Sequence, residues 1–316
     1  MLNNQNTAFR HGMIVLVCGL LLLSCRKGEK KTAAGNRVLS VVTTTGVLAD
    51  AVRRIGAENF QVTALMSQGD DPRVYEADEE DSARLAQADI IVYNGLGLEA
   101  RLTGILSEMS RSKAVIAAGE LLPKDDLIRM NGAEGTYNPY IWFDPDMWAT
   151  VIEKLGRKIA RTDLLLHDEY LDNAASYASE VRSMYWDVLS KVVGIPKNRR
   201  FLVTSDNSFA YFGRAYNIEV IDLREISGAA SGSREDPGKL ADFIADNGIR
   251  SIFVDAAVPG DFIESLRSEA GMKGCSVIIG KELYSDVQRA RGASAGNYLD
   301  MMKYDVGVIT GGLKLD

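Results

Sequence analysis

The feature that most constrains this sequence is an alternation of strand and helix patterns, which one long helical stretch interrupts. Short apolar runs predict strands over residues 38–43, 60–66, 89–93 and 114–118, with helical patterns over 47–55 and 78–87. After the interruption, strands are expected at 201–204, 219–223, 251–254 and 275–279, and a last helix over 295–309. Because strands that alternate with helices form parallel sheets covered by helices, the sequence predicts an α/β protein.

The interruption begins near Pro145 and ends near Val193, and its apolar residues recur at three- and four-residue steps. Its clearest part is a helix of about 25 residues, which is about 37 Å long at the helical rise per residue. Gly194 and Pro196 end it. We therefore predict two α/β lobes joined by one long helix.

Capping residues mark the ends of several shorter helices. Gly56 follows the first helical pattern and is expected to be its C-terminal cap. Asp236 before Pro237 marks the start of a later helix, and Gly248 marks its end.

The N-terminal residues predict an export signal. The apolar run Met13–Leu23 follows Arg10 and is too short for a membrane span, which needs about 20 residues. The run leads into Leu-Leu-Ser-Cys ending at Cys25, which resembles a bacterial lipobox. We expect residues 1–24 to be a lipoprotein signal peptide and 25–37 a flexible tether, with lipidated Cys25 anchoring an exported chain on the periplasmic or cell-surface face. The alternative is an ordinary signal peptide with a chance cysteine.

Charge and reactive residues exclude several classes of function. The formal net charge of −7 makes nucleic acid a poor partner. Cys18 lies in the expected signal and Cys25 would carry lipid, so Cys275 has no partner for an intrachain disulfide. Of the two histidines, His11 lies in the signal and His167 is expected on a helix surface, so neither stands beside a nucleophile. We therefore expect a protein that is not an enzyme.

Candidate binding residues lie at the ends of the expected strands. Ligands of open α/β sheets bind beyond the carboxyl ends of the strands. Four polar segments lie at such ends, two in each lobe: residues 70–76, 138–145, 204–209 and 282–286. We expect a cleft between the lobes to collect them, with Asp71 and Asp144 supporting their loops.

Seven stretches carry a resemblance to a known family. They are residues 41–46, 71–76, 93–99, 141–145, 211–216, 252–254 and 280–286, and they occur in the family's order over nearly the whole mature chain. The chain resembles the zinc- and manganese-binding ABC transporter lipoproteins of the TroA/ZnuA/PsaA type (cluster A-I). The resemblance implies two βα sandwich lobes with parallel sheets joined by one long rigid helix, with lobes at 38–145 and 196–316 and a linking region at 146–195. It also implies an extracytoplasmic solute-binding lipoprotein that delivers a metal ion to an ABC permease and its ATPase subunit.

The sequence departs from that family at the expected ligands. Arg73 and Tyr140 stand where the family pattern has histidine, and Asp206 stands where it has histidine or glutamate. Only Asp286 is unchanged. Zinc favours imidazole and thiolate ligands, and a guanidinium cannot donate a lone pair, so this set is a poor zinc site.

Three interpretations of these residues stay open. Arg73 replaces the metal by pairing with Asp206, Asp286 or both, in a degenerate family member with a structural or adhesive role. Alternatively, one metal ion (manganese, iron or zinc, with hard Fe³⁺ or Mn²⁺ suiting oxygen donors) binds Tyr140, Asp206 and Asp286, and Arg73 anchors an anion. In the third, Arg73 and Tyr140 bind a small anionic solute.

One motif suggests a different class of protein, a dinucleotide-binding enzyme. Gly95–Ala100 fits G-x-G-x-x-A after an expected strand, and Glu120 lies near the expected acidic position of a dinucleotide site. The same stretch also fits the binding-protein family, so an NAD-binding enzyme is a remote alternative.

Overall fold

A computed structural model describes residues 37–67, 70–130, 135–227, 236–254, 258–287 and 296–315. The expected signal peptide, Cys25 and nearly all of the expected tether lie outside these residues. Within the described ranges, no helix combines the length and the apolar character needed to cross a membrane.

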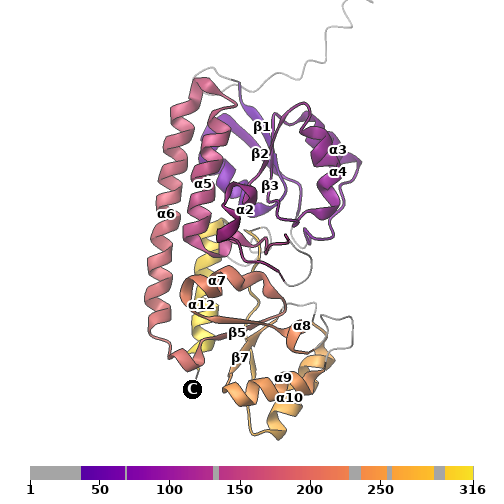
Figure 1. The fold of residues 1–316 in the computed structure, drawn as a ribbon, viewed down its shortest axis with the longest axis vertical. Helices are drawn as coiled ribbons and strands as arrows, with labels where there is room; N and C mark the ends of the chain where they lie inside the picture. The colour runs from indigo at the N-terminus through magenta and orange to yellow at the C-terminus, as the bar shows by residue number, and fades with distance from the viewer. Residues whose placement is uncertain are drawn as a thin grey trace, which may run out of the picture. The chain divides into compact units, whose positions relative to one another are not determined.

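The first lobe contains a four-stranded parallel sheet in the order β2-β1-β3-β4. Its strands are β1 (Leu39–Thr43), β2 (Phe60–Ala64), β3 (Ile90–Tyr93) and β4 (Ala114–Ala117). Helices α2 (Gly46–Gly56), α3 (Glu79–Gln87) and α4 (Thr103–Met109) connect them (Figure 1). Val41, Val92 and Ile55 are fully buried in its core, which is why these apolar runs form inner strands and a covering helix.

The second lobe repeats this strand order as β6-β5-β7-β8, again all parallel. Its strands are β5 (Phe201–Thr204), β6 (Glu219–Asp222), β7 (Ser251–Phe253) and β8 (Ile278–Ile279). Its helices are α7 (Ala210–Tyr216), α8 (Leu223–Ile226), α9 (Pro237–Asn247), α10 (Gly260–Met272) and α12 (Tyr298–Leu313).

Short 3₁₀ turns occur along the whole described chain: η1 (Ala57–Asn59), η2 (Ala100–Leu102), η3 (Gly119–Leu121), η4 (Lys124–Asp126), η5 (Ile141–Phe143), η6 (Leu164–Leu166), η7 (Lys197–Arg199) and η8 (Asn207–Phe209). The predicted α/β class with two parallel-sheet lobes is confirmed.

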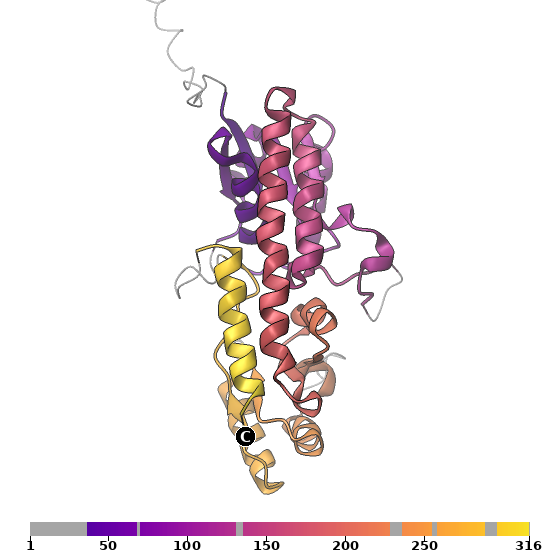
Figure 2. The same cartoon turned by 90° about the vertical axis from the view of Figure 1, so that its left-hand side faces the viewer.

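The predicted long helical region consists of two helices, α5 (Pro145–Ala160) and α6 (His167–Val193). The 27 residues of α6 span about 40 Å. It packs against α5 and α2 of the first lobe and against α7 and α12 of the second, and Figure 2 shows it beside α5 and α12. A long helix therefore joins the lobes as predicted. The lobe boundaries at 38–145, 146–195 and 196–316 remain a prediction.

Two of the three predicted helix caps are confirmed. The Asp236 side chain accepts a hydrogen bond from the Gly238 amide at 2.9 Å, and Gly248 ends α9 with a φ of 62°. The expectation for Gly56 is wrong, because Ala57 takes the positive φ of 46° instead. A Cβ on Gly56 would lie 1.9 Å from the ring of Phe60, so glycine is required there for close packing.

The strand expected over 275–279 is shorter than predicted. β8 contains only its last two residues, and Cys275 lies partly buried against the core of the second lobe. β8 is the edge strand of its sheet and pairs with β7 only through residues 278–279, and the Gly280 amide continues this contact with a hydrogen bond to the Ile252 carbonyl at 2.8 Å.

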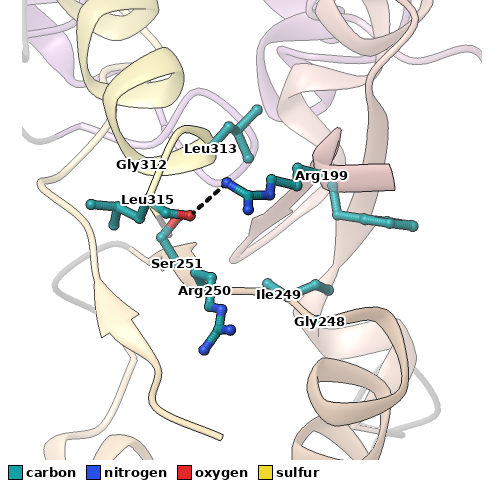
Figure 3. A pocket seen from close by; sticks show the side chains of 9 residues that line it. Arg199, Gly248, Ile249, Arg250, Ser251, Gly312, Leu313 and Leu315 are labelled. Atoms are coloured by element: carbon teal, nitrogen blue, oxygen red, sulfur yellow. Dashed lines mark hydrogen bonds between the residues drawn. The ribbon is translucent and has the colours of Figure 1, made fainter. Parts of the chain in front are cut away.

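A small cavity lies in the second lobe between the start of β5, the start of β7 and the end of α12 (Figure 3). There the Arg199 Nη1 donates to the carbonyl oxygen of Leu315 at 3.3 Å, next to Ser251 of β7. Its volume of about 10 Å³ is close to the minimum for one water molecule. We therefore interpret it as a packing feature and not as a solute site.

Candidate functional site

A cleft with a volume of about 290 Å³ lies between the two lobes. Its lining comes from the segments that follow β1, β2, β5, β6, β7 and β8 and from the segment before α5. Arg73, Tyr140, Asp206 and Asp286 all line it. The structure thus brings together the four residues singled out from the sequence, while their roles as ligands stay a prediction.

Arg73 links the two lobes through its guanidinium. Its Nε and Nη2 donate to the Asp71 oxygens at 3.0 and 2.8 Å, and its Nη1 donates to Asp206 Oδ2 at 3.1 Å. The hydrogen bond to Asp71 raises the pKa of Arg73, partial burial opposes this, and the nearby charge of Asp206 adds to it. The Arg73 side chain is 42% exposed, so water screens these ion pairs. Asp71 thus supports this loop, as expected.

Asp206 is held by the turn that follows β5. Its Oδ1 accepts a hydrogen bond from the Ser208 amide at 3.0 Å and another from the Ser208 hydroxyl, and this caps η8. Its Oδ2 faces Arg73. A cation that binds Asp206 would therefore have to displace Arg73 from Oδ2.

Asp286 contacts the start of a helix in the opposite lobe. Its two carboxylate oxygens accept hydrogen bonds from the amides of Gly46 at 3.0 Å and Val47 at 2.8 Å, in the first turn of α2. A helix N-terminus favours a carboxylate because its first amides have no partner within the helix. The Trp142 Nε1 donates to the Ser285 carbonyl at 3.1 Å and so fixes the neighbouring backbone.

Tyr140 is almost fully buried at the base of the cleft, with 9% of its surface exposed. Burial raises the pKa of its hydroxyl and the charge of Asp206 raises it further, while Arg73 opposes the shift. Its ring meets Trp142 edge-on with a centroid distance of 5.4 Å. Tyr140 is therefore a neutral phenol at neutral pH, and coordination would require it to lose a proton.

Sequence analysis missed a second arginine in the cleft. Arg224 lies in α8, two residues beyond the carboxyl end of β6, and it lines the same cleft. The rule that ligands bind beyond strand ends marks this position, because the strand was predicted, but the rule alone does not distinguish Arg224 from an exposed surface arginine.

Within the described residues, no cluster of three or more histidine, cysteine, aspartate and glutamate side chains could hold a metal ion.

Asp144 and His167 take no part in the cleft lining and instead have the structural positions predicted for them. Asp144 caps α5, since its Oδ1 accepts from the amides of Asp146 at 3.0 Å and Met147 at 3.3 Å, as expected for a loop-supporting residue. His167 begins α6 on its exposed side and its Nδ1 lies 2.9 Å from Asp168 Oδ1, as expected for a surface residue.

The glycine motif at Gly95–Ala100 does not form a phosphate loop. Glu99 is buried and its carboxylate accepts hydrogen bonds from the amides of Asn94 at 2.8 Å and Gly95 at 3.0 Å. The Thr44 hydroxyl also donates to it at 2.6 Å. Because a pyrophosphate would need such amides free, the geometry argues against the NAD-binding alternative.

Comparison with known families agrees with this fold. The sequence pattern of the family described as zinc-uptake complex component A, periplasmic, matches residues 41–312. The chain belongs to this family. Members of the zinc-uptake component A family are solute-binding proteins.

Relatives within the zinc-uptake component A family cover nearly the whole chain. The zinc-binding protein TroA of Treponema pallidum is 33% identical over 286 residues, which is 90% of this chain and 92% of TroA. The manganese-binding lipoprotein MntA of Bacillus subtilis is 31% identical over 96% of this chain and 100% of its own.

Solved structures agree with these relatives. The TroA structure superposes with a TM-score of 0.78 at 32% identity, covering 87% of this chain and 99% of TroA. Fe(III)-bound YtgA of Chlamydia trachomatis, at 23% identity and a TM-score of 0.72, covers 87% of this chain and 98% of its own and shares the fold.

Proposed function

We propose that this chain is the extracytoplasmic solute-binding component of an ABC importer of the metal-ion type. It captures one ion between its lobes and delivers it to a membrane permease that an ATPase subunit drives, and it makes or breaks no covalent bond. The observation that carries this proposal is that Arg73, Tyr140, Asp206 and Asp286, from loops of both lobes, line one cleft.

The donors in the cleft favour a hard cation. Asp206 and Asp286 offer carboxylate oxygens and Tyr140 offers a phenol oxygen, a set that suits manganese or ferric iron better than zinc. A trivalent ion also favours loss of the phenol proton more strongly than a divalent one does, which matters because the pKa of Tyr140 is raised. We therefore assign Mn²⁺ or Fe³⁺ as the cargo class, with Arg73 as the charge partner.

The contact between Arg73 and Asp206 supports a specific order of events. In the ion-free protein the guanidinium holds Asp206, and Asp286 holds the N-terminus of α2. An arriving cation would take both carboxylates from these partners. If the ion pair were permanent, the chain would instead be a degenerate member with a structural or adhesive role, and Arg73 would simply hold the lobes together.

The test is elemental analysis of the purified chain together with thermal melting in Mn²⁺ or Fe³⁺. Stoichiometric metal that disappears in Asp286→Ala supports the importer role. Protein without bound metal, and without a melting shift from any of these ions, contradicts that role and favours the structural alternative.

We further propose that the chain is anchored through a lipid on Cys25. The relative MntA is named a lipoprotein, and Ser24-Cys25 ends an apolar run that suits a signal peptide. Labelling with radioactive palmitate should mark the wild-type chain and leave Cys25→Ser unlabelled. Equal labelling of both would exclude this cysteine as the anchor.

A further inference from the structure

The cleft offers more room than a bare ion needs. A bare ion is enclosed by ligands at about 2.0–2.6 Å, which leaves little free volume around it. This cleft has a volume of about 290 Å³, and Phe209, Phe253 and Leu283 contribute apolar surface to its lining. Its size and mixed lining fit a small molecule as well as an ion.

Arg224 adds a positive charge that the proposed ion site does not use. The backbone amide of Arg224 donates to Asp222 Oδ1 at 2.8 Å, which fixes the turn that carries the side chain. Within the part of the chain that the structure describes, the Arg224 guanidinium makes no hydrogen bond or ion pair with another side chain. Arg73, by contrast, is engaged by Asp71 and Asp206.

These charges conflict with a bare cation. Once an ion took Asp206, Arg73 would lose that partner, and both Arg73 and Arg224 would face a like charge in the same cleft. A planar guanidinium pairs well with carboxylate and phosphate oxygens, often through two parallel hydrogen bonds. An oxyanion between the ion and the arginines would coordinate the ion and at the same time pair with the positive charges of the two guanidinium groups.

We propose that the cleft takes its hard cation together with a small carboxylate or phosphate anion, and that Arg224 holds this anion. The inference rests on the proposed function, because it places the cation on Asp206 and Asp286. The anion binds the guanidinium of Arg224 and the part of Arg73 released from Asp206, and it completes the shell of the ion. The apolar wall accommodates the carbon skeleton when the anion is organic.

The test is isothermal titration of the full chain, purified in detergent after chelator treatment, with three probes. These are the 1:1 complex of iron(III) with citrate, citrate alone and MnCl₂ alone. We expect the iron–citrate complex to bind at least about tenfold more tightly than the other two probes. Arg224→Gln should weaken it by about 10- to 100-fold, as expected for loss of a hydrogen bond to a charged group.

A matched control is Arg182→Gln, because the Arg182 side chain is 38% exposed and lies outside the cleft lining. It should leave all three affinities unchanged, and thermal melting should show that both variants fold. Arg224→Lys should recover part of the affinity, because it restores the charge without the planar fork.

Three outcomes would overturn the inference. If iron–citrate or Mn²⁺ binds and Arg224→Gln changes nothing, the anion role fails while the proposed function stands. If citrate alone binds as tightly as its iron complex, the cleft is an anion site and the metal-importer role fails as well. If no probe binds, both fail.

Discussion

Replacing Arg73 with glutamine should increase the affinity for Mn²⁺. An ion that takes Asp206 Oδ2 lies about 2 Å from that oxygen and displaces Arg73 Nη1, which lies 3.1 Å from it in the ion-free protein. Asp71 still holds the displaced guanidinium nearby, so we take the two cations to be about 5 Å apart. The Coulomb repulsion between a divalent ion and one guanidinium at this distance is about 7 kcal/mol at an effective dielectric constant of about 20 and about 2 kcal/mol in water. Because Arg73 is 42% exposed, we use the lower value, which corresponds to about 30-fold in affinity.

The assay is isothermal titration of wild type and Arg73→Gln with MnCl₂ at constant ionic strength. The lost ion pairs should cost about 0–1 kcal/mol of stability, so the melting temperature should fall by only a few degrees. Arg182→Gln is the control, since its partner Glu153 lies at 2.6 Å and neither residue lines the cleft. A dissociation constant within twofold of wild type, or a weaker one, would refute the placement of Arg73 beside the ion.

Three further predictions test the site and the fold. Arg73→His should raise zinc affinity, measured by competition with a fluorescent chelator, because it supplies an imidazole; unchanged affinity contradicts it. Burial raises the pKa of Asp305 well above 3.8, so the folded chain keeps its proton to higher pH than the unfolded chain does, and its stability falls as the pH rises above 3.8. Asp305→Asn should flatten this fall in melting curves recorded between about pH 5 and 8. An unchanged slope of stability against pH contradicts this. Gly156→Ala should lower the melting temperature, because the new Cβ would lie 2.4 Å from the Cβ of Ala174. Gly307→Ala is the control: a Cβ there has no atom within 4 Å, so it should raise the melting temperature, with a gain of about 1 kcal/mol in stability. Equal shifts for the two variants would contradict this.

The fold could be predicted because its signals are local. Val41 and Val92 lie in short apolar runs that form inner strands, and Asp236 and Gly248 mark helix ends through their own backbone and side-chain chemistry. The stripe of buried residues along α6, from Tyr170 onward, follows the helical period. Each of these signals depends on neighbours within a few residues.

The details of the site could not be predicted, because they depend on contacts between distant segments. Gly56 looks like a cap in the sequence, yet its role is to admit the ring of Phe60. Asp286 was singled out, but nothing near it indicates that it would meet the amides of Gly46 and Val47, which lie more than 230 positions away along the chain. Arg224 follows a predicted strand, but only the folded cleft distinguishes it from an exposed surface arginine.

The same contacts that hold the lobes together set a lower limit on how tightly a cargo must bind. To reach Asp206 and Asp286, an ion must replace a guanidinium at 3.1 Å and two helix amides at 2.8 and 3.0 Å. The half-exposed Arg73 pair is worth about 0–1 kcal/mol, and each amide hydrogen bond to the Asp286 carboxylate is worth about 1.5–3 kcal/mol. Coordination must exceed the sum of these before any net affinity appears. A weakly coordinated ion would therefore leave the ion pair intact. A strongly coordinated one, with an anion to satisfy the released arginine, would exchange it, so selectivity would arise from the cost of releasing Asp206 and Asp286 from their partners as well as from the ligands themselves.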